Sequence, residues 1–156
     1  MNSKILLVDD EKDIADLIEE VLRQDSFENI KKVYTGMDAV QVCREYQPDV
    51  IVLDIMLPDI DGIEVCRQIR EFSFCSILFL SSKNDDIDKI LGLSCGGDDY
   101  ITKPFSPREI VYRIKAQLRR QQYQSVMQTD VKGLLTVGGL ALDRESSRIY
   151  KNEKEI

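Results

Sequence analysis

Three stretches of the sequence are apolar without interruption and have the length of a β-strand: Ile5–Val8, Val50–Leu53 and Ile77–Leu80. A strand in an antiparallel sheet commonly alternates apolar and polar residues, because one face meets water. A strand in a parallel sheet is covered by helices on both faces and reads as a continuous apolar run. These runs therefore predict a parallel sheet buried between two layers of helices.

Segments of helical period separate these runs. From Ile14 to Leu22, apolar residues recur at i, i+3, i+4, i+7 and i+8, which predicts an amphipathic helix. Weaker patterns predict a short strand with its turn at 30–36, a strand at 99–102, and helices at 37–46, 63–70, 86–95 and 108–122. Five repeats of strand then helix predict an α/β domain with right-handed crossovers, a doubly wound five-stranded parallel sheet.

The C-terminal part of the chain follows a different pattern. Residues 121–132 show no clear period and are expected to be a linker. The segments "LLTV", "LALD" and "RIYKN", separated by Gly139 and polar turns, are expected to be three short strands. The sequence thus predicts a domain over residues 1–120, a linker over 121–132 and a short β-rich fragment over 133–156.

Composition excludes several classes of protein. The net charge is −7, and all of the excess negative charge lies in residues 1–120, which argues against a nucleic-acid-binding surface there. Four cysteines lie far apart without a CxxC pair, so buried thiols in a reducing cytosol are expected rather than a disulfide or a metal site. Without a membrane-length apolar run or a signal-peptide pattern, the chain is expected to be cytoplasmic, with no membrane partner.

Polar residues follow the buried strands. Ligands of open α/β sheets bind outside the carboxyl ends of the strands, so the side chains there are expected to meet. They are Asp9, Asp10, Asp54, Ser81, Ser82 and Lys103.

Close carboxylates raise one another's pKa unless a cation lies among them, and Mg²⁺ with oxygen ligands suits such a cluster. Asp54 could then attack phosphorus, while Lys103 neutralises the transferring group and Ser81 donates a hydrogen bond to it. Glu11 and Asp13 are expected to do no more than favour the start of a helix.

Longer motifs resemble a known family. Residues 1–120 are similar to the receiver domain of two-component response regulators, of the OmpR/PhoB subfamily. The resemblance is carried by "VDD" at 8–10, "VLDIMLPDIDG" at 52–62, "LSSKND" at 80–85 and "GGDDYITKPFSPREIVYRIKAQLRR" at 96–120. It implies a flavodoxin-like fold with strand order 2-1-3-4-5.

The resemblance also implies roles for individual residues. Asp54 would accept a phosphoryl group from a histidine kinase, and Lys103, before a cis peptide to Pro104, would contact that group. Asp10, Asp54 and the Met56 carbonyl would bind Mg²⁺ directly, with Asp9 acting through water. Ser81 and Tyr100 would be the switch pair. Ser81 replaces the commoner threonine and Ser82 a smaller residue, which leaves the phosphotransfer rate open.

The same resemblance implies a two-fold dimer through the fourth helix, fifth strand and fifth helix, where three intermolecular ion pairs are expected. These are Lys89 with Glu109, Asp98 with Arg113, and Asp99 with Arg120. Residues 134–156 resemble the N-terminal sheet of a winged-helix DNA-binding domain whose helices are absent from the sequence. Binding to promoter DNA is therefore expected only of an intact protein with the complete effector domain.

Several functions stay open at this point. The main hypothesis is a phosphorylation-controlled transcription regulator, a phosphoacceptor and not a multiple-turnover enzyme. A stand-alone receiver, acting through protein contacts or as a phosphate sink, is the alternative. An aspartate-nucleophile phosphatase is disfavoured because "DDEKD" at 9–13 lacks a DxDxT pattern. A flavodoxin is disfavoured because two aspartates after the first strand would repel a flavin phosphate.

Overall fold

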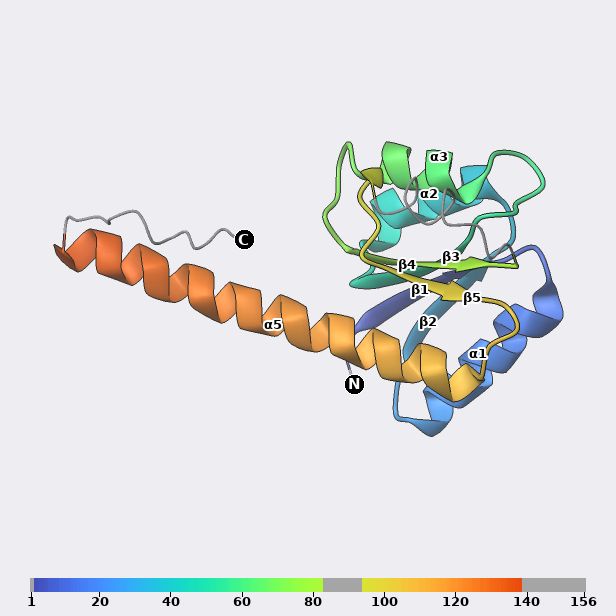
Figure 1. The fold of residues 1–156 in the computed structure, drawn as a ribbon, viewed down its shortest axis with the longest axis horizontal. Coiled ribbons are helices and arrows are strands. Elements are labelled where there is room, and N and C mark those ends of the chain that lie inside the picture. Colours follow the sequence, from blue (N-terminus) through green and yellow to red (C-terminus); the bar gives the residue numbers. More distant parts are fainter. Residues whose placement is uncertain (1, 83–93, 139–156) are drawn as a thin grey trace. The chain divides into compact units, whose positions relative to one another are not determined.

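The computed structural model describes residues 2–82 and 94–138, and contains the expected parallel sheet (Figure 1). Its strand order is β2-β1-β3-β4-β5, and every neighbouring pair is parallel. The strands are β1 (Lys4–Val8), β2 (Asn29–Val33), β3 (Val50–Asp54), β4 (Ser76–Ser81) and β5 (Asp99–Thr102). The prediction of a doubly wound, flavodoxin-like sheet is confirmed.

Helices cover both faces of this sheet. They are α1 (Lys12–Gln24), α2 (Gly36–Tyr46), α3 (Gly62–Ile69) and α5 (Pro107–Gly138). Figure 1 shows α2 and α3 together on one face and α1 on the other. The helix expected at 86–95 lies mostly outside the described residues, as do the strands expected at 140–143 and 148–152.

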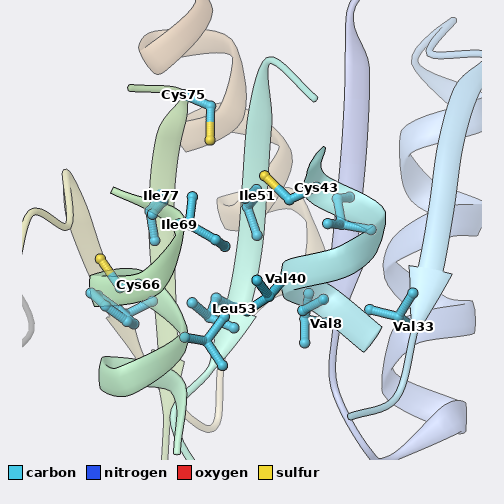
Figure 2. Close-up of a cluster of buried hydrophobic side chains, with 14 of the residues drawn as sticks. Val8, Val33, Val40, Cys43, Ile51, Leu53, Cys66, Ile69, Cys75 and Ile77 are labelled. Atoms are coloured by element: carbon cyan, nitrogen blue, oxygen red, sulfur yellow. The ribbon is translucent and has the colours of Figure 1, made fainter. Parts of the chain in front are cut away.

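Successive residues of each central strand enter two different cores, because side chains alternate across a sheet. Leu6, Ile51 and Phe79 pack against α2 and α3, in the cluster drawn in Figure 2. Leu7 and Leu78 pack on the opposite face, against α1 and the first turns of α5. All of these strand residues are almost completely buried, as the uninterrupted apolar runs predict.

Loop residues fix where two of the helices begin. Thr35 caps α2 by accepting a hydrogen bond from the Asp38 amide (3.2 Å), and Asp61 caps α3 by accepting from the Glu64 amide (2.9 Å). Such caps satisfy amides that have no partner within the helix. The loop after β3 is therefore held directly at the start of α3.

The interpretation of residues 121–137 differs from the structure. α5 is continuous to Gly138, so the expected linker and the expected strand at 134–137 are both helical. Helix nucleation is costly, but elongation adds one hydrogen bond per residue, and the packed first turns of α5 provide the nucleus. Backbone contacts divide the chain into residues 1–118 and 119–156, and the domain boundary at 120 stays a prediction.

No helix among the described residues is long and apolar enough to span a membrane. Three of the four cysteines, Cys43, Cys66 and Cys75, are buried, and Cys95 is half-buried, which agrees with the expectation of thiols enclosed by the fold.

We expect Gly62→Ala to destabilise the domain by about 1–3 kcal/mol, as overpacking does. A Cβ at Gly62 would overlap the Asp54 carbonyl oxygen and lie 2.8 Å from Ile55 Cα, and these are backbone atoms that cannot move aside. Gly36→Ala is the matched control, since its new Cβ would first meet the side chains of Ile60 and Val65. Urea unfolding should show the larger loss for Gly62→Ala, and equal losses would contradict the steric argument.

Candidate phosphoryl-transfer and metal site

Three carboxylates meet at the carboxyl edge of the sheet, as the strand ends predict. Asp9 and Asp10 follow β1, and Asp54 ends β3. One carboxylate oxygen from each lies within 4.8 Å of the others. Asp9 and Asp54 are each only 2% exposed, whereas Asp10 faces solvent. Oxygen atoms of this kind form the hard donor set that Mg²⁺ prefers, so these residues fit a divalent cation.

Lys103 brings a positive charge between the buried carboxylates. Its Nζ lies 3.1 Å from Asp54 Oδ2 and 3.3 Å from Asp9 Oδ2. The Lys103 amide donates to the Ser81 carbonyl (2.6 Å), and the expected cis peptide to Pro104 is present. The ends of β1, β3 and β5 therefore meet through one ammonium group.

Backbone amides hold the second oxygen of each buried carboxylate. The Met56 amide donates to Asp54 Oδ1 (3.0 Å), and the Glu11 amide donates to Asp9 Oδ1 (2.9 Å). Each carboxylate is thus fixed in orientation by an amide on one oxygen and by Lys103 on the other. A reacting oxygen held in this way needs little rearrangement before it attacks.

The buried carboxylates at this edge are close enough to affect one another's ionisation. Burial raises the pKa of Asp9 to about 6, and the Asp54 charge adds to this effect, although the Glu11 amide and Lys103 oppose it. Burial alone would lower the pKa of Lys103, but the neighbouring Asp54 and Asp9 carboxylates outweigh it and the net shift is upward. One ammonium group therefore compensates the two buried carboxylates only in part.

The site opens into a cavity of about 470 Å³. Its lining residues are Asp10, Glu11, Asp54, Met56, Leu57, Pro58, Ser82 and Lys103. Ser82 therefore faces the same space as Asp54. Ser81 is fully buried at the end of β4, and Tyr100 is half-buried and packs against the cluster under α2 and α3.

Sequence reasoning missed two acidic residues. Glu11 Oε1 lies 3.3 Å from Lys103 Nζ, so this side chain does more than favour the start of a helix. Asp59 accepts hydrogen bonds from the amides of Gly36 (2.8 Å) and Met37 (2.9 Å), which joins the loop after β3 to the start of α2. The position of Glu11 directly after "VDD" could have suggested its role. No sequence pattern links Asp59 to Gly36 and Met37, which lie 23 and 22 positions earlier in the chain.

Four of the six residues expected at a dimer interface have partners within the chain. Asp98 pairs with Arg70 (3.1 Å) and accepts from the Ile77 amide (2.9 Å). Arg113 pairs with Asp99 (2.8 Å) and with Glu109 (3.3 Å). Arg120 is exposed, and Lys89 lies outside the described residues. The intermolecular pairs therefore stay a prediction, and forming two of them requires Asp98, Asp99 and Arg113 to exchange partners.

Comparisons with known proteins agree with this geometry. Residues 5–115 match the family model described as the response regulator receiver domain. The chain is similar to a two-component response regulator from Clostridium difficile, with 32% identity, 77% of this chain and 98% of that chain covered, and a TM-score of 0.74.

Two further similarities concern one relative in two forms. The BeF₃-activated DrrB receiver domain has 38% identity, with 76% of this chain and 99% of that chain covered and a TM-score of 0.69. The DrrB protein of Thermotoga maritima, described as an OmpR/PhoB homologue, has 38% identity and a TM-score of 0.70. Here 78% of this chain matches 54% of the DrrB chain, about half of its length.

We expect Asp9→Asn to stabilise the metal-free protein at pH 8 by about 1–3 kcal/mol, at 1.4 kcal/mol per pKa unit. The folded pKa is raised, so the unfolded chain ionises first as the pH rises, and stability falls between about pH 4 and 6. Asparagine removes that penalty, which is fully present above pH 6 and small near pH 4. Urea unfolding with a chelator at pH 4.5 and 8 measures the difference.

Asp38→Asn, which changes an exposed carboxylate in the first turn of α2, is the control and should change stability little at either pH. An Asp9→Asn protein that is equally destabilised at both pH values would show that the carboxylate cluster is not strained.

Proposed function

Because this chain belongs to the response regulator receiver family, we propose that it accepts a phosphoryl group on Asp54 from a sensor histidine kinase and changes its association in response. The observation that carries the proposal is the contact of Lys103 Nζ with Asp54 Oδ2 (3.1 Å) beside Asp9, at the edge where the three carboxylates meet. Asp54 is a phosphoacceptor in this proposal and does not make the chain a multiple-turnover enzyme.

In the proposed reaction, a carboxylate oxygen of Asp54 attacks phosphorus, the bond from phosphorus to the donor breaks, and the donor leaves with its electron pair. Asp9, Asp10 and Asp54, with the Met56 carbonyl, would hold Mg²⁺, which supplies positive charge to the phosphoryl oxygens when bound. Lys103 neutralises the same group from the side of β5. The amide of Met56 keeps Asp54 oriented.

The proposed response begins at Ser81, whose hydroxyl moves toward the phosphoryl group, and passes to Tyr100, whose ring turns inward. Ser81 lies in β4 beside β5, and Tyr100 lies in β5, so the two belong to adjacent strands. Tyr100 is also next to Asp99, one of the residues proposed to exchange partners in the dimer. A movement of β5 would therefore reach the proposed interface directly.

The wider role that we propose is control of transcription in the cytoplasm by an intact protein with a complete winged-helix domain, as in the OmpR/PhoB subfamily. Similarity to DrrB, an OmpR/PhoB homologue, supports this assignment. One DrrB structure contains a longer chain, of which this chain matches 54%, and the other is the BeF₃-activated receiver domain. The alternative is a stand-alone receiver that acts through protein contacts or as a phosphate sink.

We expect acetyl phosphate with Mg²⁺ to phosphorylate the wild-type chain once, on Asp54, and to leave Asp54→Asn unmodified. Intact-protein mass spectrometry and mapping of the labile adduct measure this. Asp38→Asn is the control, because Asp38 is an exposed carboxylate that is not among the residues Lys103 contacts, and it should be labelled as the wild type is. Stoichiometric label on the Asp54→Asn protein would refute the assignment.

We also expect Arg120→Glu to weaken the phosphorylation-dependent dimer. Each two-fold dimer would lose two exposed pairs between Arg120 and Asp99, and exposed pairs contribute about 0–1 kcal/mol each, so dissociation should rise by up to about thirtyfold. Arg108→Glu, an equal charge change on another exposed residue of α5, is the matched control. Sedimentation that shows the same dimerisation in both variants would count against this interface.

A further inference from the structure

The four cysteines, far apart in the sequence, form two neighbouring pairs in the fold. The Cys43 thiol, in the last turns of α2, is hydrogen-bonded to Cys75, which directly precedes β4. Figure 2 shows these two sulfur atoms turned toward one another at the end of the buried cluster. Cys66 of α3 lies near Cys95, whose carbonyl accepts from the Cys66 thiol at 3.5 Å. Neither pair touches the carboxylate edge.

Arg70 gives the first pair a distinct environment. Its guanidinium, 16% exposed, is held by the carbonyls of Ser73 (3.1 Å) and Gly96 (2.6 Å) and by Asp98 (3.1 Å). Ser73 also accepts from the Cys75 amide through its hydroxyl oxygen (3.2 Å). The Ser73 hydroxyl and the Arg70 guanidinium are also among the groups that lower the pKa of the Cys75 thiol, and such neighbours are found around reactive cysteines.

The thiols of the pair differ in acidity. The hydrogen bond with Cys43 lowers the pKa of Cys75, with help from Ser73 and Arg70, and these effects outweigh burial. The same hydrogen bond and burial raise the pKa of Cys43. Burial raises the pKa of Cys66 to about 12. Thiolate character therefore concentrates on Cys75, which is 9% exposed, beside a thiol that remains protonated.

We propose that Cys75 and Cys43 are a redox-sensitive dithiol, in which Cys75 reacts with a peroxide and Cys43 then closes a reversible disulfide. In the first step the Cys75 thiolate attacks one peroxide oxygen, the O–O bond breaks, and the second oxygen leaves as hydroxide. The Cys43 sulfur then attacks the sulfenic acid, a disulfide forms, and water leaves with the Cys43 proton. The two thiols lose two electrons and the peroxide gains them.

The position of the pair separates this chemistry from that at Asp54. Cys75 lies at the amino end of β4, whereas Asp54 is the last residue of β3, which runs parallel to β4. The disulfide would join the end of α2 to the start of β4 without using any residue of the carboxylate cluster. Oxidised protein should therefore still accept a phosphoryl group, and this inference does not depend on the proposed function.

The test treats the folded, reduced chain with hydrogen peroxide, blocks remaining thiols with an alkylating agent in urea, and maps the peptides. We expect a Cys43–Cys75 disulfide that dithiothreitol reverses. Cys66→Ser is the matched control and should form it at the same rate. In Cys43→Ser, dimedone should trap a sulfenic acid on Cys75, because the resolving thiol is gone.

A second measurement does not rely on variants. Iodoacetamide applied to the folded wild-type chain should label Cys75 at least about tenfold faster than Cys66, because the thiolate is the nucleophile. Equal protection of all four thiols until the chain unfolds would overturn the proposal. So would a Cys66–Cys95 disulfide formed in preference, or Cys75 that oxidises to sulfinic acid while Cys43 stays reduced.

Discussion

Burial of a parallel sheet on both faces is the constraint on which the rest of this structure depends. Strands such as β3 and β4 have no solvent-facing side, so each of their positions is buried. Polar chemistry is therefore displaced to the two ends of the strands. The carboxylates and Lys103 gather at the carboxyl end, and Cys75 with its Arg70 and Ser73 neighbours lies at the amino end.

The carboxyl end of the sheet carries negative charge that is only partly compensated. At the carboxyl edge, Lys103 contacts Asp9, Glu11 and Asp54 together, and burial, with the neighbouring Asp54 charge, still raises the pKa of Asp9. A site in this condition gains from an added cation, which is what phosphoryl transfer needs. At the amino end, the hydrogen bond with Cys43 lowers the pKa of Cys75, helped by Ser73 and by Arg70, which is itself paired with Asp98.

Much of the fold could be predicted because its signals are local. The apolar run at Ile5–Val8 and the helical period of Ile14–Leu22 each indicate one element without reference to the rest of the chain, and both elements are present. The extension of α5 beyond residue 122 could not be predicted in this way. Its sequence shows no helical period of its own, and the helix continues from turns that tertiary packing stabilises.

At the site, the sequence by itself determined which residues end the strands. Parallel strands bring those ends to one edge of the sheet, so Asp9, Asp54 and Lys103 could be expected to meet. Only the tertiary structure decided which side chains pair. Arg113 contacts Asp99, Glu11 reaches Lys103, and Cys43 meets Cys75 across 32 positions. Such pairs depend on how the elements are placed against one another. Packing of the whole core decides that placement, and no local sequence pattern encodes it.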